Sequence, residues 1–233
     1  MKTNNVPISP LRTARLAGFL YLLVVPLGIF SLTVNSKLIV SGDPAATAGN
    51  IAASESLFRL GALSDMTAAI TMLLVALTLY PLLKPINQHT ARLMVAFLMI
   101  GVPTSLLNNL NMFAALILAK GATFLEAIPV EQAQAMMYLF IRLSGIGGTI
   151  AFIFWGLWLL PLGYLVYKSG FIPKFLGILL MISCFGYLIN SITSLLGIPV
   201  NIGMVSAVGE VLFILWLLIK GINVEKYKQA TSL

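Results

Sequence analysis

The stretch Tyr138–Lys168 constrains the fold of this chain more than any other part of its sequence. It is apolar almost throughout, and it is longer than the ~20 residues that a helix needs to cross a bilayer. Its end carries Tyr164, Tyr167 and Lys168, which are residue types expected at a membrane–water boundary. Arg142 lies near its start, and a cation in an apolar helix needs polar partners or a route to water. We therefore expect a membrane protein with a few polar groups inside it.

The composition supports this interpretation. Hydrophobic residues make up 59% of the 233 residues and charged residues 9%, whereas soluble domains carry about 25% charge. A chain in lipid must satisfy its backbone internally, as helices or as a closed barrel. The apolar runs here are continuous rather than alternating, so we predict an all-α, polytopic membrane helical bundle that forms one transmembrane domain over residues 1–233.

Six transmembrane helices are predicted, at about residues 13–34, 57–83, 91–119, 135–167, 174–196 and 203–220. The third and fourth exceed the ~20 residues needed for crossing, so we expect them to tilt or bend, at Pro103 and Pro161. Asp43 followed by Pro44 is typical of a helix N-terminus and predicts a short helix in the first outer loop. Pro129 and Glu131 predict another helix start before the fourth span.

The orientation follows from the basic residues near the span ends. Two of them, Lys37 and Lys120, fall on one side, and ten fall on the other. These ten are Lys2, Arg12, Arg15, Lys84, Arg92, Lys168, Lys174, Lys220, Lys226 and Lys228. Because the richer side faces the cytoplasm, both termini are predicted to be cytoplasmic.

Polar residues within the spans mark the candidate site. At ~1.5 Å per residue from the inner end of each span, most of them fall in the outer half of the bundle and Glu210 lies near its middle, one turn from Ser206. We predict a buried polar network or an outward-opening ligand site, with Arg142 and Arg59 as cations and Asp65 and Glu210 as anions. The full set is Asp65, Asn108, Asn111, Arg142, Asn190, Glu210 and Arg59.

Several alternatives remain open for these residues. Buried amides and ion pairs also hold membrane helices together without binding anything. Arg59 lies near the outer boundary, where a long basic side chain extends toward water. Glu210 is either a proton carrier or a neutral acid bonded to Ser206.

Other chemistry is not indicated. His89 is the single histidine and falls in an inner loop, and Cys184 is the single cysteine, so no metal site, cofactor or catalytic group is assigned. The net charge of +7 is spread over loop ends rather than clustered, so no nucleic-acid partner is expected. Gly145, Gly147 and Gly148 lie within a span, where small residues allow close helix contact.

With these residues in view, the chain resembles a bacterial membrane family known as domain of unknown function 4386. The motifs that carry the resemblance are SLFRLGALSD from Ser56, RLSGIGG followed by LPLGYLVYKSGFIPKFLGILL within Arg142–Leu180, GYLINS from Gly186, and GEVLFILWLLIKG from Gly209. The resemblance implies a multi-pass protein of the bacterial inner (plasma) membrane. It implies no particular activity.

Three functions follow as hypotheses. The first is a non-enzymatic binding, sensing or transport-related protein that takes an unknown small molecule at the polar cluster. The second is an intramembrane enzyme that uses Asp65 or Glu210 for acid–base chemistry and Arg142 for anion recognition. The third is a structural or accessory subunit without a ligand site. The expected partners are membrane lipids and a second copy of the chain or another membrane subunit.

Overall fold

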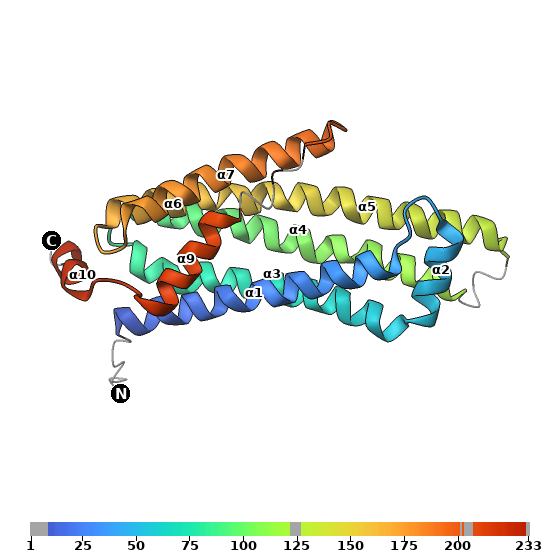
Figure 1. Ribbon diagram of the computed structural model, residues 1–233, viewed down its shortest axis with the longest axis horizontal. Coiled ribbons are helices and arrows are strands. Elements are labelled where there is room, and N and C mark those ends of the chain that lie inside the picture. Colours follow the sequence, from blue (N-terminus) through green and yellow to red (C-terminus); the bar gives the residue numbers. More distant parts are fainter. Residues whose placement is uncertain (1–8, 122–126, 201, 203–206, 232–233) are drawn as a thin grey trace. The chain divides into compact units, whose positions relative to one another are not determined.

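The computed structural model describes residues 9–121, 127–200, 202 and 207–231, and every regular element in these residues is an α-helix, as predicted. Lys2 and Ser206, which the sequence analysis used, lie outside this range. The helices are α1 (Pro10–Leu38), α2 (Pro44–Ala53), α3 (Glu55–Leu83), α4 (Gln88–Lys120), α5 (Val130–Leu157), α6 (Leu159–Ser169), α7 (Lys174–Leu195), α9 (Val208–Ile219) and α10 (Val224–Thr231) (Figure 1).

Five candidate membrane spans are long and apolar enough to cross a bilayer. They are α1, α3, α4, the pair α5–α6 and α7, and they correspond to the first five predicted spans. This makes the chain a multi-pass membrane protein. The predicted sixth span begins at residue 203, outside the described residues, and its described part, α9, has 12 residues. Such a helix is ~18 Å long, less than the ~30 Å hydrocarbon core, so six spans and cytoplasmic termini stay predictions.

The fourth span is divided into α5 and α6 close to Pro161, where the sequence predicts a bend; the bend itself stays a prediction. Helix α5 ends at Leu157 and α6 begins at Leu159, with Trp158 between them. Pro161 has no N–H to bond the carbonyl of Leu157, and its ring crowds that carbonyl, which is the usual cause of a break four residues before a proline. By contrast, α4 continues through Pro103.

The helices divide into two compact units. Unit 1 comprises Met1–Leu22, Thr71–Ile100 and Phe152–Leu233, and unit 2 comprises Leu23–Ile70 and Gly101–Ala151. Because α1, α3, α4 and α5 each contribute to both units, neither unit is a continuous segment of the chain. A single transmembrane domain therefore stays a prediction.

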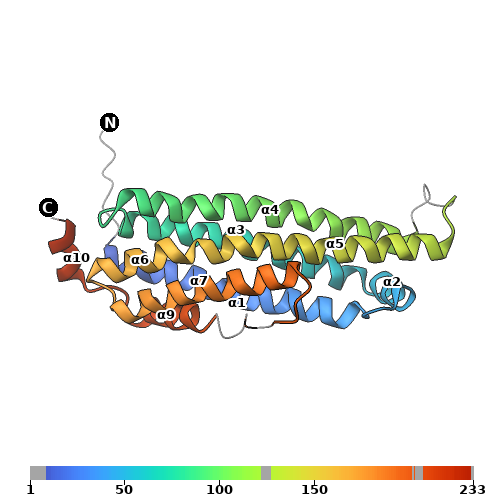
Figure 2. The same ribbon diagram turned by 90° about the horizontal axis from the view of Figure 1, so that it is seen from above.

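Unit 1 is held together by close helix contacts at glycines. Helices α6 and α7 lie side by side (Figure 2), and a Cβ at Gly163 of α6 would lie 2.6 Å from the carbonyl oxygen of Gly177 of α7. A Cβ at Gly209 of α9 would lie 2.6 Å from Ser183 Oγ of α7. Likewise, a Cβ at Gly18 of α1 would lie 2.9 Å from Leu217 Cβ of α9. Such small residues let membrane helices approach until their backbones touch.

In unit 2, α2 begins where the sequence predicted. Asp43 Oδ1 accepts a hydrogen bond from Ala46 N at 2.9 Å, and Pro44 occupies the first helical position. The turn before α2 is attached to α5, because Gly42 N donates to Tyr138 Oη at 2.7 Å. The core of this unit is formed by buried side chains of α1, α2, α3, α4 and α5, namely Val34, Leu38, Ala48, Ile51, Phe58, Met112, Ala115, Leu116, Leu118, Met137 and Ile141.

Candidate functional site

The candidate site in unit 1 is organised around Glu210, in the first turn of α9. The neighbouring Gly209 is packed against Ser183 and Leu179 of α7, which fixes the start of α9 against that helix. A negative charge in the first turn of a helix is favoured by the helix dipole and the free N–H groups there. The start of α9 therefore suits an acidic side chain, and the Gly209 contact sets where its carboxyl group points.

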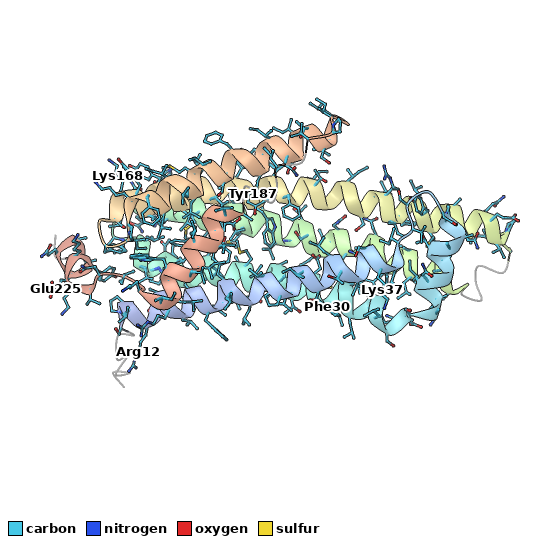
Figure 3. All side chains as sticks on the ribbon, in the orientation of Figure 1. Arg12, Phe30, Lys37, Lys168, Tyr187 and Glu225 are labelled. Carbon is cyan, nitrogen blue, oxygen red and sulfur yellow. The ribbon has the colours of Figure 1, made fainter. Side chains whose placement is uncertain are left out.

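Two tyrosines hold this carboxyl group. The hydroxyl of Tyr21, on α1, donates a hydrogen bond to Glu210 Oε2, and Tyr21 is 3% exposed. The hydroxyl of Tyr187, on α7, is a second hydrogen-bonding neighbour of the same carboxyl group. Tyr187 is labelled in Figure 3. The acid is thus shared between α1, α7 and α9, and neither tyrosine was assigned to a site from the sequence.

Aromatic rings surround these groups. Tyr21 lies against Trp158, with ring centroids 5.8 Å apart, and Tyr187 stacks on Phe152 at 6.4 Å. Trp158 is fully buried in the α5–α6 interruption, and its Nε1 has no hydrogen-bond partner among the described residues. An unsatisfied buried donor costs ~1–3 kcal/mol. We call Tyr21, Trp158, Tyr187 and Glu210 the Glu210 site.

The Glu210 site contains a carboxyl group but no basic side chain. The ion pairs within the described residues both involve Glu55, and neither involves Glu210. A carboxylate in apolar surroundings is stabilised by a cation, and the faces of tyrosine and tryptophan rings attract cations as well. The Glu210 site is therefore suited to binding a small positively charged ligand or a proton.

Unit 2 contains a separate set of amides. The Nδ2 group of Asn109 on α4 donates to Asp65 Oδ2 of α3 at 2.9 Å and to its own helix at Ser105 O. On the neighbouring face of α4, Asn108 Nδ2 donates to Ser144 O of α5 at 2.9 Å. Asn111 Nδ2 in turn donates to Asn108 Oδ1 at 3.1 Å. These bonds tie α4 to α3 on one side and to α5 on the other.

The side chain of Asn108 also accounts for one of the glycines within α5, Gly147. A Cβ at Gly147 would lie 2.0 Å from Asn108 Oδ1, so any other residue at this position would displace that amide. A Cβ at Gly145 would have no described atom within 4 Å. The predicted close contact therefore occurs at Gly147, and it accommodates a polar side chain rather than a neighbouring backbone.

The predicted cations make no ion pair or hydrogen bond with these amides in the described part of the chain. Arg59 is exposed and pairs with Glu55 at 2.8 Å, and Glu55 also pairs with Lys120 at 2.7 Å. Arg142 is exposed on α5 and makes no ion pair within the described part of the chain. Helices α5 and α6 together cover 40 residues, or ~60 Å of helix. This is twice the ~30 Å hydrocarbon core, so Arg142 has room to lie where water reaches it.

The structure thus brings only some of the predicted residues together. Asn108 and Asn111 are bonded to each other, whereas Asp65 is bonded to Asn109, which the sequence analysis did not single out. Asn190 belongs to unit 1, where its Oδ1 accepts from Ile202 N at 3.3 Å. A pairing of Arg142 with Glu210 would join residues of different units and stays a prediction.

Comparisons with known proteins agree with the resemblance seen in the sequence. The family model described as domain of unknown function 4386 matches residues 16–221. An uncharacterized protein from Archaeoglobus fulgidus is 35% identical over 147 residues, which cover 63% of this chain and 75% of that protein. No solved structure matches.

Proposed function

From its membership of the family described as domain of unknown function 4386, and from the Glu210 site, we propose that this chain is a membrane protein that binds a small organic cation. The observation that carries the proposal is the carboxyl group of Glu210, which two tyrosines hold in apolar surroundings without a basic partner among the described residues. An ionisable residue within a membrane protein is expensive to keep and usually functional.

The surroundings of the carboxyl group favour this class of ligand. An anion would be repelled by Glu210, and an uncharged polar molecule would leave the acid without a counter-charge. An ammonium group, in contrast, is attracted by the carboxylate, and an aromatic ring face that such a cation reaches adds ~0.5–2 kcal/mol. The proposed role is therefore binding, in a sensor or a transport-related protein, rather than catalysis.

Thermal unfolding in lipid nanodiscs tests this function. Choline and tetraethylammonium chloride serve as probes, with sodium chloride at equal ionic strength as the reference. Binding to the folded state raises the midpoint, because a ligand at 100 times its Kd stabilises that state by ~2.7 kcal/mol. Glu210→Gln keeps the size and an acceptor for Tyr21 but removes the charge, so we expect this shift to disappear.

The matched control is Glu225→Gln, at an exposed position on α10 (Figure 3). This variant should keep the full shift, because Glu225 lies outside the Glu210 site. Equal shifts in the wild type and in Glu210→Gln, or no shift with either cation in the wild type, would contradict the proposed function.

A further inference from the structure

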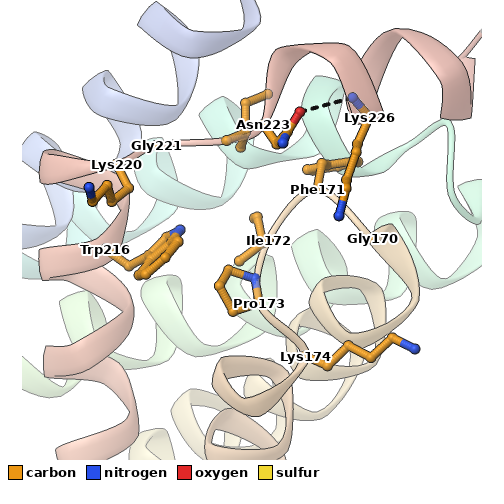
Figure 4. Close-up of a pocket in the computed structure, with 11 residues that line it drawn as sticks. Gly170, Phe171, Ile172, Pro173, Lys174, Trp216, Lys220, Gly221, Asn223 and Lys226 are labelled. Atoms are coloured by element: carbon orange, nitrogen blue, oxygen red, sulfur yellow. Dashed lines mark hydrogen bonds between the residues drawn. The ribbon is translucent and has the colours of Figure 1, made fainter.

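A pocket in unit 1 is separate from the Glu210 site. It has a volume of about 480 Å³ and lies between the α6–α7 turn and the segment that joins α9 to α10 (Figure 4). Its lining includes Phe171, Ile172 and Pro173 from the turn and Trp216, Lys220 and Asn223 from the other segment, with Lys174 and Lys226 at its ends. A volume of this size is within the range of small-ligand sites.

The two walls of the pocket are joined by specific contacts. Asn223 N donates to Phe171 O at 3.0 Å, and the ring of Tyr227 packs edge-on against Phe171 with centroids 5.2 Å apart. Burial raises the pKa of the Tyr227 hydroxyl. Gly221 has φ of +66° and donates to Trp216 O, which turns the chain away from α9. These contacts fix the α9–α10 segment against the α6–α7 turn.

Several polar side chains of the pocket carry hydrogen-bond donors. Trp216 Nε1 is buried and has no partner among the described residues. The side-chain oxygen of Asn223 accepts from Lys226 N at 3.0 Å, which leaves its amide nitrogen turned toward Ile172 (Figure 4). Lys174, Lys220 and Lys226 supply ammonium groups, and no carboxylate is among the lining residues.

Ordinary boundary lysines do not account for this combination. Lysines at the ends of apolar helices commonly extend into water or toward lipid headgroups, and Lys174, whose ammonium lies 5.5 Å from the Tyr167 ring centroid, fits that role. Lysines in this role occur without a pocket and without a buried hydrogen-bond donor beside them. Trp216 also lines the pocket, and its indole N–H is buried without an acceptor among the described residues, so an oxygen acceptor brought to it would satisfy it.

We propose that this pocket binds a phosphate group. A phosphate offers several acceptor oxygens, so it can bond the Asn223 amide and the flexible ammonium groups of Lys220 and Lys226 at once, and the Trp216 indole when the atoms that cover its N–H move aside. The phosphate belongs either to an anionic lipid or to a small soluble molecule. The lipid is favoured because the pocket lies at the ends of two apolar helices, α7 and α9, and because Phe171, Ile172 and Pro173 give it apolar walls.

Indole N–H resonances provide a direct readout in ¹⁵N-labelled full-length protein. The chain has three tryptophans, and a Trp216→Phe variant assigns the signal of Trp216. Phosphatidylcholine nanodiscs with and without phosphatidylglycerol test the lipid, and inorganic phosphate and glycerol 3-phosphate added to phosphatidylcholine nanodiscs test soluble phosphates. We expect phosphatidylglycerol to move the Trp216 signal downfield while the signals of Trp155 and Trp158 stay in place.

Lysine substitutions then test the proposed contacts. Each lysine near an anionic headgroup contributes about fivefold to affinity, so the double substitution Lys220→Gln and Lys226→Gln should weaken binding about 25-fold. Lys228→Gln is the matched control, since this lysine also lies on α10 but does not line the pocket. It should leave the Trp216 titration unchanged.

The outcomes separate the two phosphate sources. A response to phosphatidylglycerol alone supports a lipid headgroup, and a response to soluble phosphates supports a phosphorylated small molecule. No response to any of these phosphates would overturn the proposal. An equal loss in Lys228→Gln and in the double variant would also overturn it, because binding would then reflect general surface charge rather than the pocket.

Discussion

Substitution of Gly163 by alanine is the sharpest test of how unit 1 is packed. A Cβ at this position would lie 2.6 Å from Gly177 O and 3.0 Å from Met181 N, both backbone atoms that cannot rotate away. Overpacking of this kind costs ~1–3 kcal/mol, and the higher helix propensity of alanine returns up to ~1 kcal/mol. Because any alanine in a helix makes the same propensity gain, we expect Gly163→Ala to be ~1–3 kcal/mol less stable than an alanine substitution without this clash.

Gly145→Ala is the matched control, because it makes the same chemical change within a helix where the new Cβ meets no described atom within 4 Å. This variant should be neutral or stabilised by up to ~1 kcal/mol. The assay is unfolding by sodium dodecyl sulfate in mixed micelles, followed by far-ultraviolet circular dichroism. The reasoning is refuted if Gly163→Ala is as stable as Gly145→Ala, since the α6–α7 backbones would then not be in contact.

Two further predictions concern unit 2. Asn109→Ala should lower the unfolding free energy by ~1–2 kcal/mol, because Asn109 is 5% exposed and bonds Asp65; an unchanged midpoint in the same micelle titration would argue against this bond. Tyr138→Phe removes the acceptor of Gly42 N. Loss of a hydrogen bond worth ~1 kcal/mol should accelerate amide hydrogen exchange at Gly42 about fivefold. A Gly42 exchange rate equal to that of the wild type would show that the turn is held by something else.

Most of the helices could be predicted from the sequence, because the residues that start, extend or interrupt a helix lie within it or next to it. Continuous apolar runs predicted the five long spans, and Asp43 before Pro44 predicted the start of α2. Pro161 predicted the discontinuity in the fourth span, although the break itself falls at Trp158, since a proline disturbs the carbonyl four residues before it. Each of these features depends on residues that are close together in the sequence, so the sequence pattern is enough to predict it.

The polar contacts could not be predicted in the same way. Tyr21 and Glu210 are 189 positions apart, and their meeting depends on the glycine contacts of α9 with α1 and α7. The predicted partner of Asp65 was a cation, because opposite charges attract most strongly. The structure instead gives Asp65 an amide, Asn109, which lies ~100° around α4 from Asn108.

The Glu210 site exists only if the carboxyl group of Glu210 is bound by side chains of other helices. A double-mutant cycle with Tyr21→Phe and Glu210→Leu measures that interaction directly in the micelle titration. We predict a coupling free energy of at least ~1 kcal/mol, as for a hydrogen bond to an acidic group. Additive effects of the two substitutions, within ~0.3 kcal/mol, would contradict the claim and remove the basis for the Glu210 site.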